Sequence, residues 1–393
     1  MGLRLDIAMI LMLFLLKSTG NVQASILNVK QYGAKVNADI TQALTKAWKA
    51  ACASTGQSKV VVPGGTYKLG AVPLEGPCKG PIELQVIGTL QAPEQQSGDS
   101  WVSFNHVDFF TLSGSGTFDG QGKIAWGQSE CSKNKYCKQL PINIRFNFIT
   151  NAIIRDITSL DSKEFHINVL GCKNVTFQHV TIKAPETSVN TDGIHIGRST
   201  GIHIIDTNIG TGDDCVSLGD GSRDITVEKV NCGPGHGISI GSLGKFPNEE
   251  PVSGVKVIGC TLTNTVTGVR IKTWPASPTG SASDMHFEDI IMNNVGNPII
   301  IDQVFYYPWN QCQTKIPSRI KISNVSFINI RGTSKFQEAV KLVCSKGVPC
   351  EKVELRDIDL KYNGHDGSST YHCINVKPTI SGKQNPPACT VKA

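Results

Sequence analysis

From about residue 60 onward, the chain consists of short runs in which apolar and polar residues alternate. β-Branched residues dominate these runs, Gly, Asn and Asp interrupt them, and no helical periodicity appears. Many runs share one frame: an alternating strand, a polar corner and a second short strand. Most steps between them are 23 to 30 residues, which is the range of solenoid repeats. The frame begins at Asn151, Asn174, Gly201, Asp224, Gly254, Asp284, Asn324 and Lys352.

A unit of this size cannot bury its apolar side alone, so the units must stack. The pattern therefore predicts an all-β fold, a single-stranded right-handed parallel β-helix. A propeller would need about 40 to 50 residues per blade, and a leucine-rich repeat would need a Leu/Asn frame that this sequence lacks. Because the repeats account for most of the chain length, we expect one domain over residues 25–393 rather than two or three.

Two elements precede the repeats. Residues 26–32 alternate like a strand, and residues 39–51 form a helix that we expect to cover the N-terminal end of the solenoid. Asp39 is the predicted N-cap, and Gln42, three residues later, would complete a capping box.

Residues 1–24 have the pattern of a cleaved secretory signal. Arg4 precedes an apolar run over residues 7–16, and small residues stand before the predicted cleavage site after Ala24. No other apolar stretch approaches about 18 residues, so we expect no membrane anchorage after cleavage. Cleavage removes two basic residues and one acidic residue and lowers the formal charge from +6 to +5.

Cysteine usage agrees with secretion. The chain has 13 cysteines, and the close pairs Cys131 with Cys137, Cys344 with Cys350 and Cys373 with Cys389 indicate short disulfide loops. An odd count leaves at least one thiol unpaired. Two N-glycosylation sequons begin at Asn174 and Asn324.

Charge narrows the choice of partner. Only 18% of residues are charged, which excludes a disordered polyampholyte, a coiled coil and a nucleic-acid-binding tail. The mildly basic balance suits an anionic partner, and composition alone does not distinguish nucleic acid, acidic lipid and acidic polysaccharide.

Charged residues gather between residues 190 and 272. Asp192 and Asp213 are 21 positions apart, and Asp213 and His236 are 23 apart, each close to one coil. Residues one coil apart stack at about 4.8 Å. Asp192, Asp213, Asp214 and His236 should therefore form one patch, which Arg270 and Lys272 join further along.

This patch suits hydrolysis of a glycosidic bond, in which one carboxylic acid protonates the leaving oxygen and another carboxylate activates water. Neighbouring carboxylates would raise the pKa of the acid. The alternative is a calcium site or an Asn/Asp ladder at a β-helix corner. Because consecutive strand residues point to opposite faces, either Asp213 or Asp214 is buried, or a kink at Gly212 turns both outward.

The other three residues of the patch are His236, Arg270 and Lys272. His236 lies among close glycines, which let a substrate approach the backbone. Arg270 and Lys272 are two positions apart and share a strand face. Two cations beside the acids suit a carboxylate on the substrate.

At these residues the chain resembles the plant polygalacturonases of the glycoside hydrolase family that attacks homogalacturonan in pectin. The four family signatures stand in order: N-T-D at 190–192, G-D-D at 212–214, G-H-G at 235–237 and R-I-K at 270–272. The likeness covers nearly the whole mature sequence. The surroundings of the last two signatures are most similar to the exo-acting, pollen-type branch.

The resemblance implies inverting hydrolysis of α-1,4-galacturonosyl linkages. Asp213 would be the general acid, Asp192 and Asp214 would position and deprotonate the water, and His236 would support the acid or place the substrate. The substrate-binding residues would be Asn190, Arg270, Lys272 and Tyr306. No metal ion and no cofactor are expected, and the partner would be pectic polysaccharide, not nucleic acid. The enzyme would be a monomer in the cell wall or extracellular space.

One departure from the family pattern affects the site. Phe305-Tyr306-Tyr307-Pro308 has one residue more than the usual Tyr-Cys-Pro and lacks its Cys. The choice of sugar-site aromatic thus stays open among Phe305, Tyr306 and Tyr307, and Cys312 is the predicted single free thiol. Alternative functions are an endo-acting polygalacturonase, a calcium-dependent pectate lyase and a non-catalytic pectin-binding wall protein.

Overall fold

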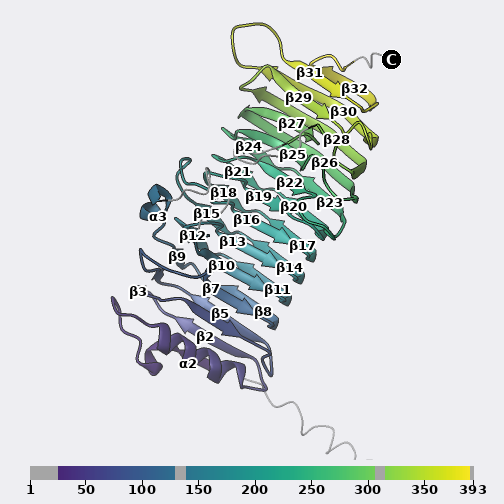
Figure 1. The fold of residues 1–393 in the computed structure, drawn as a ribbon. Helices are drawn as coiled ribbons and strands as arrows, with labels where there is room; N and C mark the ends of the chain where they lie inside the picture. The colour runs from purple at the N-terminus through teal and green to yellow at the C-terminus, as the bar shows by residue number, and fades with distance from the viewer. Residues whose placement is uncertain (1–24, 129–138, 306–314, 390–393) are drawn as a thin grey trace, which may run out of the picture.

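The computed structural model describes residues 25–128, 139–305 and 315–389, and in these ranges the chain winds into a long solenoid of stacked strands (Figure 1). Strands of successive coils pair in parallel, as β13, β16 and β19 do. The prediction of a parallel β-helix is confirmed. Parallel crossovers of this kind are right-handed. The predicted signal segment, residues 1–24, lies outside the described residues.

One face of the solenoid is a sheet with 11 described strands. Its strands, in order along the axis, are β4 (Val72–Glu75), β7 (Ser100–Asn105), β10 (Ile142–Asn147), β13 (Ile167–Leu170), β16 (Ile194–Gly197), β19 (Val216–Leu218), β22 (Ile238–Leu243), β25 (Thr267–Thr273), β27 (Asn297–Asp302), β29 (Glu338–Val343) and β31 (Thr370–Ile374).

The remaining 21 described strands form the other sheet, and most coils give it two strands separated by a corner. They are β1 (Ser25–Asn28), β2 (Ser58–Val62), β3 (Thr66–Lys68), β5 (Ile82–Val86), β6 (Thr89–Gln91), β8 (Asp108–Ser113), β9 (Thr117–Asp119), β11 (Thr150–Arg155), β12 (Thr158–Leu160), β14 (Lys173–Gln178), β15 (Thr181–Lys183), β17 (Thr200–Ile205), β18 (Asn208–Gly210), β20 (Arg223–Glu228), β21 (Asn231–Cys232), β23 (Val252–Ile258), β24 (Thr261–Thr263), β26 (Gly280–Val295), β28 (Ile320–Ser334), β30 (Glu351–Tyr362) and β32 (Thr379–Asn385).

The first residue of each repeat frame forms a corner. Asn151 and Asn174 both have φ of 54°, in the left-handed region that Asn tolerates better than most residues. Asn174 Nδ2 donates to Asn151 Oδ1 at 2.8 Å, one coil below. Asn324 Nδ2 donates to Asp284 Oδ1 in the same way. The amides of both predicted glycosylation sequons therefore take part in corner ladders.

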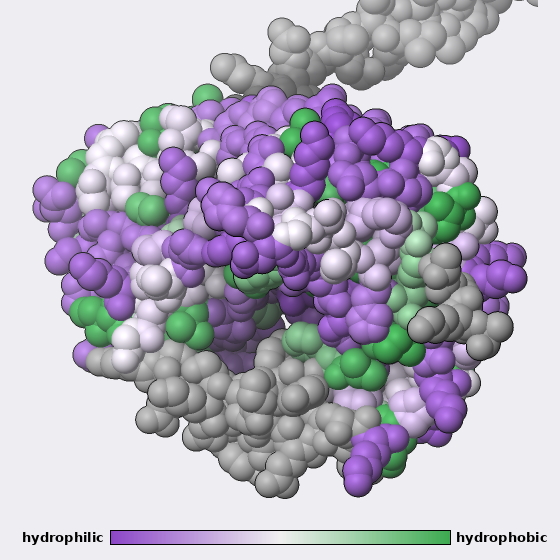
Figure 2. Space-filling view, turned by 90° about the horizontal axis from the view of Figure 1, so that it is seen from above, coloured by the Kyte–Doolittle hydropathy of each residue, from purple (hydrophilic) through white to green (hydrophobic). Residues whose placement is uncertain are grey.

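The interior is filled by apolar side chains stacked coil on coil. Phe104 and Phe146 occupy paired positions on β7 and β10, and their rings stack at 5.3 Å. At the N-terminal end, helix α2 (Thr41–Cys52) covers the first coils, as predicted (Figure 1). Its Trp48 packs edge-on against Phe104 and Phe110, each at 5.9 Å. Figure 2 shows a mostly hydrophilic surface at the C-terminal end, with scattered hydrophobic residues.

The predicted start of this helix is wrong by two residues. Ile40 occupies the N-cap position, and no capping box forms there. Backbone hydrogen bonds pair residues 38–40 with Lys68, and Ile40, with φ of −113° and ψ of 12°, is not helical, so the helix begins at Thr41. Asp39 Oδ1 still accepts a hydrogen bond from Thr41 N at 2.7 Å.

Three other local features were not predicted as they stand. The strand predicted for residues 26–32 ends at Asn28, and a 3-10 helix, η1 (Val29–Tyr32), follows. A capping box between Asn28 and Gln31 stabilises this turn. A short helix, α3 (Lys123–Gln128), follows β9.

Among the described residues, no helix is both long and apolar enough to cross a membrane.

The cysteines divide into bonded pairs and buried thiols. The predicted bonds Cys344–Cys350 and Cys373–Cys389 are present, and the structure adds Cys52–Cys78 and Cys215–Cys232. Cys131, Cys137 and Cys312 lie outside the described residues.

The prediction of a single free thiol is wrong. Cys172 and Cys260 are both free and buried in the core. Burial raises the pKa of each thiol to about 11, so both behave as small apolar side chains.

Candidate active site

The candidate site lies on the outer face of the 11-stranded sheet. His195, Ser217, Ser239 and Arg270 pair in register across β16, β19, β22 and β25. Because strand residues alternate, these side chains point away from the core, and Lys272 shares their face two residues further along β25. The N-T-D, G-D-D and G-H-G segments directly precede β16, β19 and β22. Stacking of the coils thus brings the predicted residues together.

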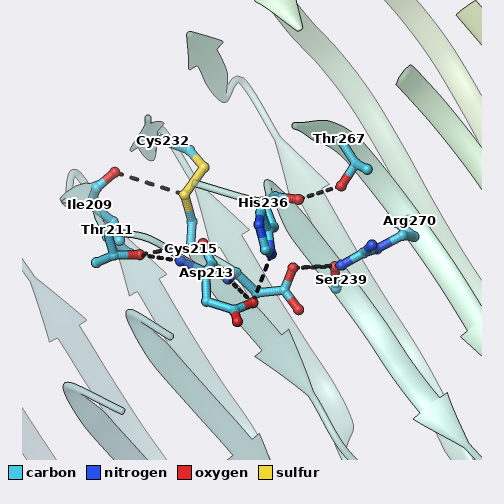
Figure 3. The surroundings of a disulfide bond; sticks show 10 residues. Ile209, Thr211, Asp213, Cys215, Cys232, His236, Ser239, Thr267 and Arg270 are labelled. Atoms are coloured by element: carbon cyan, nitrogen blue, oxygen red, sulfur yellow. Dashed lines mark hydrogen bonds and ion pairs between the residues drawn. A yellow bond between two sulfur atoms is a disulfide. The ribbon is translucent and has the colours of Figure 1, made fainter. Parts of the chain in front are cut away.

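Asp213 and His236 form the exposed part of the site. His236 Nδ1 lies 2.9 Å from Asp213 Oδ1, and Figure 3 shows the ring pointing at this carboxylate. The side chains are 35% and 25% exposed, respectively. Burial lowers the pKa of His236, but the hydrogen bond and charge of Asp213, helped by Asp214, outweigh burial and raise it above its usual value.

Asp214 forms the buried part. It is 3% exposed, and Oδ1 accepts hydrogen bonds from Ser239 Oγ at 2.7 Å and Arg270 Nη2 at 2.9 Å. Lys272 Nζ reaches Oδ2 at 3.3 Å. Burial raises the pKa of this carboxyl, but Lys272 and Arg270 outweigh it, so the pKa lies below the usual value. Of the two arrangements expected for the Asp pair, Asp214 is buried and Asp213 faces outward.

Asp192 lies behind the pair, 6% exposed. Its Oδ2 accepts a hydrogen bond from Ser217 Oγ at 2.6 Å, and Ser217 Oγ lies 2.8 Å from His195 Nδ1. Burial raises the pKa of Asp192 well above its usual value, and the charges of Asp213 and Asp214 raise it further. The sequence indicated a raised pKa for the general acid, whereas the raised pKa occurs at Asp192, which the resemblance assigns to the attacking water.

Of the four predicted substrate-binding residues, Asn190, Arg270 and Lys272 are described, and Arg270 and Lys272 contact Asp214. Asn190 has φ of 56°, and its Nδ2 donates to Glu164 Oε1 at 3.1 Å. Tyr306, like Tyr307, lies outside the described residues. Phe305 is described, and its ring lies 5.8 Å from Arg270 Cζ and 5.3 Å from Lys272 Nζ. Of the three aromatic candidates, Phe305 is therefore placed beside the two cations.

Sequence reasoning missed four polar residues of this region: Glu164, His195, Ser217 and Ser239. Ser217 and Ser239 each donate to a carboxylate of the cluster. Burial lowers the pKa of His195 to about 4, so its ring is neutral near neutral pH. The alternation on β16, β19 and β22 could have identified His195, Ser217 and Ser239, since each lies on the same strand face as Arg270.

Two alternative interpretations of the acid cluster were an Asn/Asp ladder and a calcium site. Asn/Asp ladders occur at the corners of the other sheet, but the acids of this site bond to Ser, His, Arg and Lys side chains. Three possible ligand atoms lie within 4.8 Å of one another: one oxygen each of Asp213 and Asp214 and a ring nitrogen of His236. These atoms are close enough together to bind one cation. The absence of a metal requirement stays a prediction.

A disulfide supports the loops that carry Asp213 and His236. Cys215 follows Asp214, Cys232 precedes the G-H-G segment, and their sulfur atoms are bonded (Figure 3). The backbone N–H of Cys215 also donates to Gly237 O at 2.8 Å. The disulfide therefore fixes the two loops relative to each other.

Replacing Cys215 and Cys232 together by Ser should lower both stability and activity. Loss of a bond closing a loop of this length lowers the free energy of unfolding by about 3 kcal/mol. The matched control replaces Cys373 and Cys389, whose separation is 16 residues against 17. We expect a similar loss of thermal stability in both variants but a large fall in kcat in the first alone. An equal kcat in the two variants would show that the bond does not position the acids.

Comparison with known proteins gives the family. The pattern of the glycosyl hydrolases family 28 matches residues 52–386. An exopolygalacturonase of Oenothera organensis is 57% identical over 90% of this chain and 99% of its own length. An exopolygalacturonase of Platanus acerifolia is 55% identical over 92% and 97%. A polygalacturonase of Nicotiana tabacum is 52% identical over 100% and 99%.

Solved structures share the fold. An exopolygalacturonase from Thermotoga maritima superposes with a TM-score of 0.75 at 18% identity, covering 92% of this chain and 93% of its own. An endo-xylogalacturonan hydrolase from Aspergillus tubingensis gives a TM-score of 0.77 at 24% identity, covering 90% and 96%. With the family pattern matched over most of its length, and with plant relatives at more than half identity, the chain belongs to family 28 of the glycosyl hydrolases.

Proposed function

We propose that this glycosidase removes galacturonic acid from the non-reducing end of homogalacturonan by hydrolysing α-1,4 linkages. The observation that carries the proposal is the set of Arg270, Lys272 and Phe305 beside three clustered carboxyls. A cleavage site flanked by two cations suits a sugar that carries a carboxylate. The plant relatives named exopolygalacturonases support exo action.

In the proposed mechanism Asp213 is the general acid. Its hydrogen bond to His236 can run either way, since a charged ring donates to the carboxylate and a protonated Asp213 donates to a neutral ring. The pair can thus hold one proton, which passes to the glycosidic oxygen as the bond to the anomeric carbon breaks. Asp192 and Asp214 orient the attacking water, and its proton passes to that pair of carboxyls.

Arg270 and Lys272 have two roles in this proposal. In the structure both contact Asp214, and they keep it ionised. Their remaining hydrogen-bond donors, at the edge beside Phe305, are proposed to hold the galacturonate carboxylate. Asn190 and an aromatic of the 305–307 segment, with Tyr306 retained as the candidate, would complete the sugar site.

We further propose that the enzyme is secreted and acts in the plant cell wall as a monomer, without a metal ion. The signal-like N-terminus, the disulfides and the plant relatives support secretion to the cell wall. The pectic polysaccharide is the proposed macromolecular partner, and no nucleic acid is expected to bind.

The function is tested by following polygalacturonate hydrolysis by proton NMR with a chelator present. We expect galacturonic acid as the only early product, released first as the β-anomer because the α-linkage is inverted. A ladder of oligomers from the start would indicate an endo-acting enzyme, and first release of the α-anomer would contradict inversion. Chelator-sensitive formation of unsaturated, ultraviolet-absorbing ends would identify a lyase and overturn the proposal.

A further inference from the structure

The charges along the outer face differ on the two sides of the acid cluster. Toward the C-terminus, the next coils contribute Arg270 and Lys272, and Lys341 beyond them is paired with Asp302 on the same face. Toward the N-terminus, the coil of β13 contributes Glu164, which lies just before the strand. A polyanion is therefore attracted on one side of the cleavage site and meets a carboxylate on the other.

The Glu164 side chain is held in place by two donors. Oε1 accepts a hydrogen bond from Asn190 Nδ2 at 3.1 Å, and Oε2 accepts one from the backbone N–H of Leu140 at 2.6 Å. The side chain is only partly buried, so its remaining acceptor positions are open to a ligand. Burial raises the pKa of Glu164, while these two donors and Arg145 oppose the shift.

The cation whose charge acts on Glu164, Arg145, is already ion-paired. Arg145 lies on β10, one coil further toward the N-terminus, and forms an ion pair with Asp99. Among the described residues of β4, β7, β10 and β13, Arg145 is the only cation, and its ion pair with Asp99 leaves it less available to a further galacturonate carboxylate. The C-terminal side has two cations within reach of one acid, which is the opposite arrangement.

We propose that Glu164 recognises the non-reducing end of the substrate by accepting a hydrogen bond from its free 4-hydroxyl group. This inference rests on the proposed function. A terminal galacturonate has a hydroxyl donor at C4, whereas an internal residue has a glycosidic oxygen there, with no proton to donate. An internal residue would also be followed by another sugar, whose carboxylate would meet the negative charge of Glu164.

The position of Glu164 fits this role. Asn190 and Asp192 belong to the coil after Glu164, and Asp213 and Asp214 to the next. Because Glu164 Oε1 bonds the Asn190 side chain, the carboxylate lies toward the coil of Asn190, one to two coil heights, or roughly 5 to 10 Å, from the acid pair. A pyranose ring is about as long as one coil is high. One sugar therefore fits between the cleaved bond and Glu164, and a second would overlap the carboxylate.

The test compares two trigalacturonates. One is saturated, and the other carries a 4,5-unsaturated non-reducing end, which lacks the 4-hydroxyl group. For the unmodified enzyme we expect kcat/KM to be at least about tenfold higher on the saturated substrate, as for loss of a hydrogen bond to a charged group. Glu164→Gln and Glu164→Ala remove the charged acceptor of this hydrogen bond, so the ratio of the two kcat/KM values should fall to roughly threefold or less. Products longer than the monomer should then appear from polygalacturonate.

The matched control is Glu83→Gln. Glu83 is also a half-buried carboxylate with two partners, Lys59 at 2.9 Å and Ser113 at 2.6 Å, but it lies on β5 of the other sheet. It should keep the full preference. Equal cleavage of both substrates by the unmodified enzyme, or an unchanged preference in Glu164→Gln, would overturn the inference. No galacturonic acid from the saturated substrate would instead refute the proposed function. Glu164→Gln keeps an acceptor for Asn190, so it tests the idea even where Glu164→Ala fails to fold.

Discussion

Asp213→Asn should reduce the release of galacturonic acid by about two to four orders of magnitude, the contribution of a well-placed general acid. The substitution keeps an oxygen that can accept a hydrogen bond from His236 but removes the transferable proton. Since the Asp213 side chain is 25% exposed, the fold should tolerate the change. The measurements are reducing-sugar release, the thermal unfolding midpoint and binding to immobilised pectate, of which only the first should change greatly.

The control for this variant is Asp206→Asn. Asp206 is an exposed corner residue with φ of 47°, a conformation that Asn adopts readily, and it follows β17 on the other sheet. Its activity should be unchanged. Persistent hydrolysis by Asp213→Asn together with lost pectate binding would show that Asp213 binds substrate but is not the acid.

The fold could be predicted because the repeat carries the same information many times. Each frame places an alternating strand after a corner, and residues such as Asn151 and Asn174 mark that corner in successive coils. A wrong assignment in one frame therefore changes the predicted fold little. The helix start is specified once, by local competition: residues 38–40 pair with Lys68 through backbone hydrogen bonds, and no propensity at Asp39 reveals this.

The site could be predicted only in outline. Signature spacing near one coil predicted that Asp192, Asp213 and His236 would lie together. It did not reveal that Asp214 is buried against Arg270 and Lys272, because that depends on how the loop before β19 turns. Glu164 belongs to no signature, and its link to Asn190 exists only once β13 and β16 are stacked.

Asp192→Asn should abolish most activity and, at the same time, stabilise the fold at neutral pH. Burial and the charges of Asp213 and Asp214 raise the pKa of Asp192 in the folded protein well above the value of about 3.9 that an unfolded chain gives it. Keeping this carboxyl ionised therefore costs folding free energy. Asn is neutral, fills the same space, retains an acceptor for Ser217 Oγ and can donate to the neighbouring carboxylates.

The sign of the pH dependence follows from linkage. Between the unfolded and the folded pKa, the native state binds a proton that the unfolded chain lacks, so the stability contributed by Asp192 falls as pH rises through this window. Asp192→Asn removes that loss. Its unfolding midpoint should match the unmodified protein below about pH 4 and exceed it by roughly 1 to 3 °C at pH 7, as expected for a change of about 1 kcal/mol in a chain of this size.

The measurement is thermal unfolding of both proteins from pH 4 to 8. Asp302→Asn is a suitable comparison, because Asp302 is also buried, at 8% exposure, but has its own cation, Lys341 Nζ, at 2.8 Å. Removing a paired carboxylate leaves a cation without its partner and should destabilise the fold at pH 7. Shifts of opposite sign in the unfolding midpoints of the two variants at pH 7 would show that Asp192 is retained at a cost to stability. This is expected of a residue kept for its chemistry. A lower midpoint for Asp192→Asn at pH 7 would mean that the cluster stabilises the ionised form of this carboxyl.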